Sequence, residues 1–207
     1  MSKFYTPIKI LNKGIYLAYC SIVILFIAYI IFGGDLSFAS KSKGNFRVRS
    51  IRGAAFCGDK VLKSNELVPI GCQIQTHAQS NIFMTNGENV ISFGENAKGE
   101  IRGIDHLVLS AGMLRLKLKE GLIIETPQGK SYLKNGDYLS RVSDLFKETE
   151  LINFNGEIKL ESKISTNDFV VITPSHWGGL GGRFGEKIGN LVLLNNEQKK
   201  IFKVILD

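Results

Sequence analysis

The sequence predicts an all-β domain, an antiparallel β roll or sandwich or a short β-solenoid, behind one N-terminal transmembrane helix. Three observations lead to this prediction. Residues 14–34 form an uncharged block, apolar residues beyond it recur at every second position, and Asn-Gly pairs separate strand-like runs. With 44% hydrophobic and 22% charged residues, the chain of 207 residues has the composition of a packed globular protein, which excludes a disordered or collagen-like chain.

The uncharged block is expected to be a transmembrane signal anchor over residues 14–34. Residues 15–32 carry no formal charge, and as a helix they would rise about 27 Å against a hydrocarbon core of about 30 Å. The preceding residues, 1–13, contain Lys3, Lys9 and Lys13 and no acid. This order predicts a cytoplasmic head and a downstream domain outside the cytoplasm.

Two alternatives to the anchor stay open. Ser37-Phe38-Ala39 is a small-residue triplet of the kind that signal peptidase cleaves, and cleavage after Ala39 would leave a soluble periplasmic protein. The block could also be a buried helix of a soluble protein.

A basic stretch, residues 35–50, is expected to link the anchor to the domain. The membrane-proximal basic residues are Lys41, Lys43, Arg47, Arg49 and Arg52. They could contact anionic headgroups or sugars, although solubility beside the membrane is the plainer explanation. A nucleic-acid partner is not expected, because the sequence has no basic helix and no aromatic residues interleaved with the basic run.

Strict alternation predicts the strands of the downstream domain. In residues 113–119 apolar and basic residues alternate, so one face should be buried and the other should be a solvated basic stripe. The apolar set is Leu114, Leu116 and Leu118, and the basic set is Arg115, Lys117 and Lys119. Shorter runs occupy residues 81–84, 89–93, 157–161 and 168–172, and the one helical candidate, 142–147, is too short to matter.

Three Asn-Gly pairs are expected to close antiparallel hairpins. They are Asn86-Gly87, Asn135-Gly136 and Asn155-Gly156, and residues 151–160 give the clearest case. Both residue types tolerate the positive φ that a type I′ turn requires at its two central positions. A faint echo of Ile-x-Thr or Val-x-Thr at residues 74–76, 124–126 and 171–173 is either chance or a β unit used more than once.

Residues 67–101 resemble the FecR domain of bacterial envelope proteins. The residues that match its pattern are Leu67, Gly71, Ile74, Thr76, Ser80, Ile82, Met84, Gly87, Val90 and Ile91. Residues 121–142 and the pair Asn155-Gly156 look like the second half of that domain, so the resemblance extends over residues 51–163. It implies a periplasmic, all-β, non-enzymatic FecR-like domain over residues 51–164 that senses or relays a state of the envelope, with a C-terminal β extension over residues 165–207.

The best-known FecR proteins carry a helical anti-sigma region ahead of their membrane helix. Only 13 residues precede the predicted anchor here, so no such region is expected. The resemblance therefore does not imply direct control of a sigma factor. What the resemblance then implies is the exported domain alone, used for binding a protein, glycan or other ligand.

No catalytic or metal-binding pattern is present, and we expect no enzyme, metal or small-molecule cofactor. The histidines, His77, His106 and His176, lack a second ligand at zinc spacing. The sequence has no nucleophile elbow, H-E-x-x-H motif or phosphate-binding loop. A wall transpeptidase that uses Cys72 is a remote alternative, because the residues around this cysteine depart from that family's pattern.

Cys57 and Cys72 are a disulfide candidate. They lie 15 residues apart in a domain expected to sit in an oxidising compartment. A bridge would stabilise the fold by on the order of 3 kcal/mol through the unfolded state. Two buried free thiols are the alternative.

Residues 175–189 are expected to form a mobile glycine-rich loop that contains the only tryptophan of the chain. Its partner-binding candidates are His176, Trp177, Arg183 and Phe184, because aromatic residues and arginine supply most binding hot spots. The alternative is a glycine-rich connection in which Trp177 packs as a lid on the β core.

These observations together predict a bacterial inner-membrane protein with its C-terminal domain in the periplasm. Its expected role is a signalling accessory or sensor that binds an envelope protein or a glycan. A structural scaffold of the cell envelope or cell wall is the alternative function.

Overall fold

The computed structural model describes residues 45–204, except residues 166 and 186. The expected head, anchor and cleavage site, together with Lys41 and Lys43, lie outside the described residues. In the part that the structure describes, no helix is long and apolar enough to cross a membrane.

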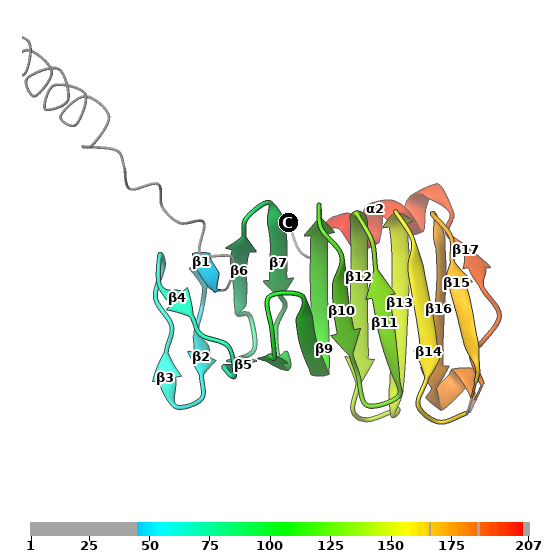
Figure 1. Ribbon diagram of the computed structural model, residues 1–207, viewed down its shortest axis with the longest axis horizontal. Helices are drawn as coiled ribbons and strands as arrows, with labels where there is room; N and C mark the ends of the chain where they lie inside the picture. The colour runs from blue at the N-terminus through cyan, green and yellow to red at the C-terminus, as the bar shows by residue number, and fades with distance from the viewer. Residues whose placement is uncertain (1–44, 166, 186, 205–207) are drawn as a thin grey trace, which may run out of the picture. The chain divides into compact units, whose positions relative to one another are not determined.

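Strands account for most of the described chain, with one short α-helix near its C-terminal end (Figure 1). The strands are β1 (Phe46–Arg52), β2 (Ala55–Cys57), β3 (Lys60–Val61), β4 (Leu67–Val68), β5 (Gln73–Thr76), β6 (Asn81–Asn86), β7 (Asn89–Phe93), β8 (Lys98–Ile101), β9 (His106–Leu118), β10 (Leu122–Glu125), β11 (Gly129–Leu133), β12 (Gly136–Ser143), β13 (Glu148–Asn155), β14 (Ile158–Ser162), β15 (Phe169–Ile172), β16 (His176–Gly181) and β17 (Val192–Leu193). A 3₁₀ turn, η1 (Gly182–Phe184), and helix α2 (Asn196–Val204) complete the set. The prediction of an all-β fold is confirmed.

The strands form two sheets. Sheet A has the order β4–β1–β6–β7–β9–β12–β13–β16–β17. Sheet B has the order β3–β2–β5–β8–β9–β10–β11–β14–β15. Neighbouring strands are antiparallel except for β9 and β10, which run parallel.

Strand β9 belongs to both sheets because it bends near its middle. Its first half pairs with β8 and β10 in sheet B, and its second half pairs with β7 and β12 in sheet A. Gly112 lies at the bend with φ 84°, and a Cβ at this position would come 2.5 Å from the Cα of Ala97. Glycine therefore permits both the backbone conformation and the close approach.

The inward faces of the two sheets share one hydrophobic core. The leucines of β9 are part of it, since Leu114, Leu116 and Leu118 are at most 2% exposed. The expected burial of this face is confirmed. Because consecutive residues of a strand alternate between its faces, the intervening residues point to the outer side of sheet A.

The outer side of β9 is not the solvated basic stripe that the sequence predicts. Arg115 is only 6% exposed, its guanidinium contacts both carboxylate oxygens of Asp137 at 2.7 and 2.8 Å, and it lies 4.5 Å from the ring centre of Phe154. The prediction is wrong for Arg115, because β12 and β13 supply a carboxylate and an aromatic ring that cover it. Lys117 and Lys119 are exposed as expected.

One of the three Asn-Gly pairs closes a hairpin. Asn86 pairs with Asn89 at the end of the β6–β7 hairpin, so the two turn residues are Gly87 and Glu88. Of these two only Gly87 has a positive φ, 60°. The hairpin prediction is confirmed here, but the turn lies one residue later than the type I′ prediction places it.

The other two Asn-Gly pairs are corners between the sheets, so the hairpin prediction is wrong for them. Asn135-Gly136 connects β11 of sheet B to β12 of sheet A, and Asn155-Gly156 connects β13 of sheet A back to β14 of sheet B. The flanking strands pair with other strands and not with each other, because each belongs to a different layer of the core.

The Tyr138 hydroxyl joins these two corners. It accepts a hydrogen bond from the backbone N–H of Glu157 at 3.1 Å and lies 3.1 and 3.2 Å from the carbonyl oxygens of Lys134 and Asn135. Burial raises the pKa of Tyr138, so the hydroxyl keeps its proton and can donate to those carbonyls. A Cβ at Gly136 or Gly156 would overlap this hydroxyl, which is why both corners contain glycine.

A repeated β unit is visible in the topology. Strands β5–β8 and β11–β14 both follow the order sheet B, sheet A, sheet A, sheet B. The three echoed residue triplets lie at the ends of β5, β10 and β15, all in sheet B. They therefore mark strand ends of one sheet. They do not recur at the same place in each unit, because β5 begins the first unit whereas β10 precedes the second and β15 follows it.

Substituting Tyr138 with phenylalanine tests the corner. The change leaves the partly buried N–H of Glu157 and two carbonyls without this partner, so we expect the free energy of unfolding to fall by about 1–3 kcal/mol. Urea unfolding of the purified protein measures it. Tyr132→Phe, on the open outer side of sheet B, is the matched control and should change stability by less than about 0.5 kcal/mol. Equal effects of the two substitutions would contradict the role of the Tyr138 hydroxyl.

Candidate functional site

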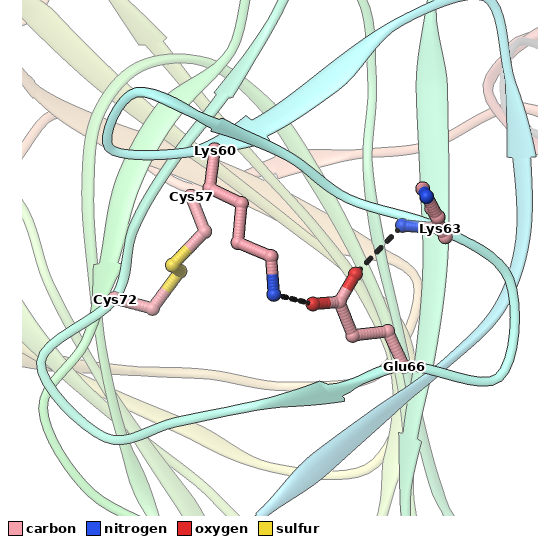
Figure 2. The surroundings of a disulfide bond; sticks show 5 residues. All are labelled: Cys57, Lys60, Lys63, Glu66 and Cys72. Carbon is pink, nitrogen blue, oxygen red and sulfur yellow. Dashed lines mark hydrogen bonds and ion pairs between the residues drawn. A yellow bond between two sulfur atoms is a disulfide. The ribbon is translucent and has the colours of Figure 1, made fainter.

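Cys57 and Cys72 are joined by a disulfide in the structure (Figure 2). Cys57 ends β2 and Cys72 immediately precedes β5, the strand that pairs with β2, and their Cα atoms lie 5.4 Å apart. The bridge therefore links β2 to β5, its neighbouring strand in sheet B. A bridged Cys72 offers no thiolate, so the structure gives no support to chemistry at this residue.

The loop beside the disulfide is held by Glu66 (Figure 2). Its carboxylate contacts the ammonium of Lys60 and accepts the backbone N–H of Lys63 at 2.9 Å. The hydrogen bond from Lys60, followed by that from Lys63, lowers the pKa of Glu66. These contacts order the loop between β3 and β4.

The glycine-rich segment is a strand and not the mobile loop that the sequence predicts. Its first part is β16, which pairs with β13 along its whole length, and its middle part is η1. A Cβ at Gly179 would come 2.5 Å from the ring of Phe184. The glycines therefore let η1 fold back closely against the strand. In the sequence alone, the same glycines have the composition of a loop.

Trp177, Arg183 and Phe184 lie together on the outer side of sheet A. The rings of Trp177 and Phe184 meet edge to face at 5.7 Å, and the Arg183 guanidinium lies 5.4 and 5.1 Å from their centres. Arg183 also contacts the carboxylates of Glu148, at 3.5 Å, and of Glu150. The structure thus brings together three of the four predicted partner-binding residues.

His176 is separate from this group. Its Nδ1 lies 3.0 Å from the carbonyl of Pro174 and 3.1 Å from Oγ1 of Thr173, in the turn before β16. These contacts fix the turn that leads from sheet B into sheet A.

Trp177 packs on a small apolar cluster on the outer side of sheet A. The buried members of the cluster are Leu139, Ile152 and Leu194, and the last of these comes from the C-terminal segment that crosses this side of the sheet. The arrangement corresponds to the lid alternative. A half-buried ring that covers an apolar cluster stabilises the fold. Arg183, which lies over this ring, is already engaged in ion pairs with Glu148 and Glu150.

The membrane-proximal arginines lie on β1, which begins at Phe46, inside the range expected to be linker. Arg47 donates to the carbonyl of Asn65 at 2.9 Å, and Arg49 donates to Oγ1 of Thr85 at 2.9 Å. Both are exposed on the outer side of sheet A, and Arg52 is exposed at the end of the same strand.

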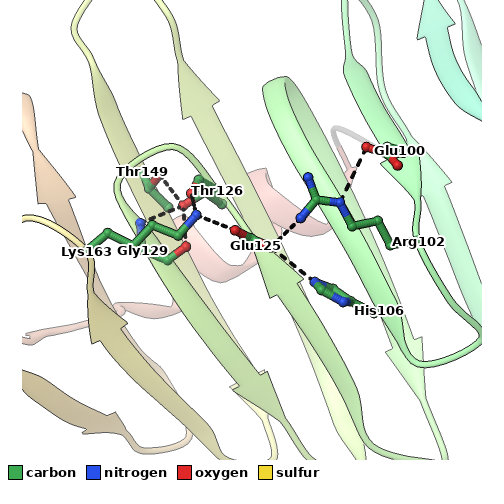
Figure 3. A network of polar contacts seen from close by, with 8 residues as sticks. All are labelled: Glu100, Arg102, His106, Glu125, Thr126, Gly129, Thr149 and Lys163. Carbon is green, nitrogen blue, oxygen red and sulfur yellow. Dashed lines mark hydrogen bonds and ion pairs between the residues drawn. The ribbon is translucent and has the colours of Figure 1, made fainter. Parts of the chain in front are cut away.

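A polar network on sheet B centres on Glu125, which the sequence analysis did not single out (Figure 3). Its carboxylate contacts the guanidinium of Arg102 at 2.7 Å, Nε2 of His106 at 3.3 Å and the ammonium of Lys163 at 2.6 Å. Arg102 in turn reaches Glu100 at 3.4 Å. These residues come from β8, β9, β10 and the end of β14, so the network ties the middle of sheet B together.

The network continues inward through Thr126. Lys163 donates to its carbonyl at 3.0 Å, and Oγ1 of Thr149 on β13 donates to Oγ1 of Thr126 at 2.9 Å. Oγ1 of Thr126 also accepts the N–H of Gly129 at 3.1 Å. Buried hydroxyls thus connect sheet B to sheet A at this level of the core. Among the described residues no cluster has the composition of a metal site.

The outer side of sheet B carries an open aromatic and charged surface, which we call the Tyr132 surface. Tyr132 lies between Lys130 and Lys159, whose ammonium groups are 5.2 and 5.8 Å from its ring centre. Lys159 also lies 4.9 Å from the ring of Phe169, which is 59% exposed, and forms an ion pair with Glu161 at 2.6 Å. The ion pair raises the pKa of Lys159 and lowers that of Glu161.

Two shallow hollows lie on the Tyr132 surface. The larger, about 540 Å³, is lined by Tyr132, Leu133, Lys134, Glu157, Lys159 and Glu161. The smaller, about 320 Å³, extends from Lys159 to Phe169. Lys159 and Glu161 lie between them, so a ligand spanning both hollows would meet aromatic rings at each end and a charged pair in the middle.

Comparison with known proteins gives a likeness of fold. No protein-family model and no curated protein sequence matches the chain. A solved structure described as a "putative anti-sigma factor", from Parabacteroides distasonis ATCC 8503, has a TM-score of 0.52 at 8% identity. The match covers 63% of this chain and 64% of that one, less than two thirds of its length. At this identity the likeness shows the fold alone.

A second structure with the same description and organism has a TM-score of 0.41 at 11% identity. It covers 63% of this chain and 59% of that one, and the score is too low to carry an argument.

Replacing Trp177 by alanine tests whether the ring is a lid. We expect the free energy of unfolding to fall by about 2–4 kcal/mol, since the outer cluster of sheet A loses its cover and Arg183 loses a stacking partner. Thermal or urea unfolding measures the change, with Leu145→Ala at an 83% exposed position as the control. A loss below about 1 kcal/mol would instead favour a ring held out for a partner.

Glu125→Gln tests the network in sheet B. Arg102 and Lys163 lose their anionic partner, so the free energy of unfolding should fall by about 1 kcal/mol at pH 7. The hydrogen bond and charge of Lys163, with Arg102 and His106, hold the pKa of Glu125 below its ordinary 4.5. A carboxylate with a lowered pKa stabilises the fold at pH values above its ordinary pKa. This stabilisation is lost as the pH falls through the lowered pKa.

The difference between the natural protein and Glu125→Gln should therefore shrink below about pH 4. Unfolding at pH 7 and at pH 3 measures it. Glu120→Gln, at an exposed carboxylate in the connection between β9 and β10, serves as the control. An effect of Glu125→Gln that stays constant between the two pH values would contradict the ionic origin.

Proposed function

We propose that this chain is a non-enzymatic, membrane-anchored protein of the bacterial envelope. Its FecR-like β domain, placed in the periplasm, would bind a protein or glycan partner as a signalling accessory. The observation that carries the proposal is the likeness of the two-sheet fold to the structure described as a "putative anti-sigma factor", which agrees with the sequence resemblance to FecR domains. The uncharged block and the disulfide between Cys57 and Cys72 support the proposed envelope address, since bridges of this kind persist in oxidising compartments.

The Tyr132 surface is the part of the domain best suited to a partner. The outer side of sheet A is partly covered by the C-terminal segment, and its tryptophan is packed there. The outer side of sheet B instead exposes Tyr132 and Phe169 beside paired charges and two hollows. Rings flanked by donors and acceptors suit both the apolar face and hydroxyl rim of a sugar and the side chains of a protein.

The address is tested separately from the binding. A C-terminal alkaline phosphatase fusion should be active in cells, and an alkylating reagent should modify Cys57 and Cys72 only after reduction. A fusion that works only as a cytosolic reporter, with both cysteines alkylated at once, would overturn the placement in the periplasm.

Site-specific photocrosslinking tests the surface and the role. A photoreactive residue at position 132 should capture a partner in cells. The same residue at position 145, where Leu145 occupies an exposed turn, should not capture it. Lys159→Glu, which turns the ion pair of Lys159 and Glu161 into two like charges, should reduce the yield at least tenfold. A receptor or regulator as the captured partner supports signalling, whereas wall or secretion-machine components would favour a scaffold. Equal capture at the two positions would reject this surface.

A further inference from the structure

β15 forms one of the two edges of sheet B. Just before this strand the Asp168 carboxylate accepts the N–H of Ile188 at 2.8 Å, so the chain after η1 lies beside the start of this edge. Within the described part of the chain each sheet ends in two outer strands, and three of these four, β3, β4 and β17, have two residues each. β15 has four, Phe169–Ile172, and pairs with β14 on one side only. It contains neither proline nor lysine, the residues that commonly protect an edge from pairing with another chain.

The hydrogen bonds around β14 show which groups of β15 point outward. Lys134 and Lys163 donate their N–H groups to the carbonyls of Glu157 and Gln128, so the odd-numbered residues of β14 face β11. Ser162 donates its N–H to the carbonyl of Asp168, so the even-numbered residues face β15. Because these directions alternate in an antiparallel pair, the backbone N–H and C=O groups of residues 169 and 171 point away from β14, toward the free edge.

The side chains at the same two positions are the exposed ones. Phe169 is 59% and Val171 is 42% exposed on the outer side of sheet B, whereas Val170 packs against the core. The edge therefore offers two outward-pointing backbone residues, both with apolar side chains, placed symmetrically about Val170.

We infer that β15 pairs antiparallel with β15 of a second copy of the chain. With the two-fold axis at Val170, Phe169 of one copy lies opposite Val171 of the other, and each such pair can exchange both backbone hydrogen bonds. The cross-strand neighbours are then phenylalanine and valine, an aromatic and β-branched pair that stabilises sheets. Sheet B continues through the axis into the sheet B of the second copy.

The charges next to the edge agree with this register. Glu161 is the neighbour of Phe169 on β14, and Lys159 is the neighbour of Val171. Each row across the dimer thus runs from Glu161 through Phe169 and Val171 to Lys159, with unlike charges at its two ends. No like charges meet at the new contact.

The contact is small, so it belongs to the weak and transient class of interfaces. Confinement to a membrane raises the effective concentration of two copies, which lets a weak contact form in cells. This step rests on the membrane anchor of the proposed function, and the phosphatase fusion tests that anchor independently of the pairing.

Cysteine crosslinking in cells tests the register. Two differently tagged full-length copies, both with Cys20→Ser, carry Phe169→Cys and Val171→Cys respectively. Opposite residues in a hydrogen-bonded pair have Cα atoms about 5.5 Å apart, within the range for a disulfide, whereas two copies of the same variant place their cysteines on the diagonal at about 7–8 Å. Oxidation should give at least fivefold more crosslinked dimer for the mixed pair than for either variant alone.

The controls separate pairing from collision and from misfolding. Leu145→Cys in both copies, at an 83% exposed turn, reports random collision. Thermal unfolding of each purified variant in detergent should stay within a few degrees of the parent. The inference would be overturned if the mixed pair crosslinked no more than Leu145→Cys, or no more than either single variant. It would also be overturned if the edge proved to be occupied by another protein or by another segment of the chain.

Discussion

The bend in β9 is the constraint on which the two-layer structure depends. The first half of the strand lies in sheet B and the second half in sheet A, so the two layers are covalently continuous at their centre. Units of four strands lie on either side of it, each passing from sheet B to sheet A and back. Gly112 at the bend has the positive φ and the close neighbour that only glycine accommodates, and moving the bend by one residue would exchange the buried and exposed faces of the second half.

The corners of the second unit depend on a polar group inside an apolar core. Tyr138 places its hydroxyl where two connections between the sheets meet, and both connections contain a glycine that makes room for it. Thr126 and Thr149 link the layers at the level of Glu125 in a similar way. These groups satisfy backbone and side-chain donors that the change of sheet leaves without strand partners, and they therefore specify the topology as well as stabilise it.

The two outer faces differ in what remains available to a partner. On sheet A the glycine strand β16, η1 and the C-terminal segment cover an apolar cluster and hold Arg183 in ion pairs. On sheet B the Tyr132 surface is open, and it adjoins the unpaired edge at β15. A domain anchored in a membrane could thus use one face for structural closure while the other face and its edge contact a ligand and a second copy.

Local periodicity was enough to predict the strands, the all-β class and the buried leucines of β9, because alternation and composition are properties of short segments. The candidate pairing of Cys57 with Cys72 rested on their spacing and on the expected oxidising compartment. It could not assign strands to sheets, so two Asn-Gly corners were predicted to be hairpins and the glycines of β16 were predicted to be a loop. Arg115 and Glu125 depend on partners more than twenty residues away, Asp137 for the first and Arg102 and Lys163 for the second, and only the folded chain brings these groups within hydrogen-bonding distance. The sequence determined which segments become strands. The tertiary structure decided which faces, corners and charges meet, since strands of both sheets carry the same alternating pattern and the pattern does not say to which sheet a strand belongs.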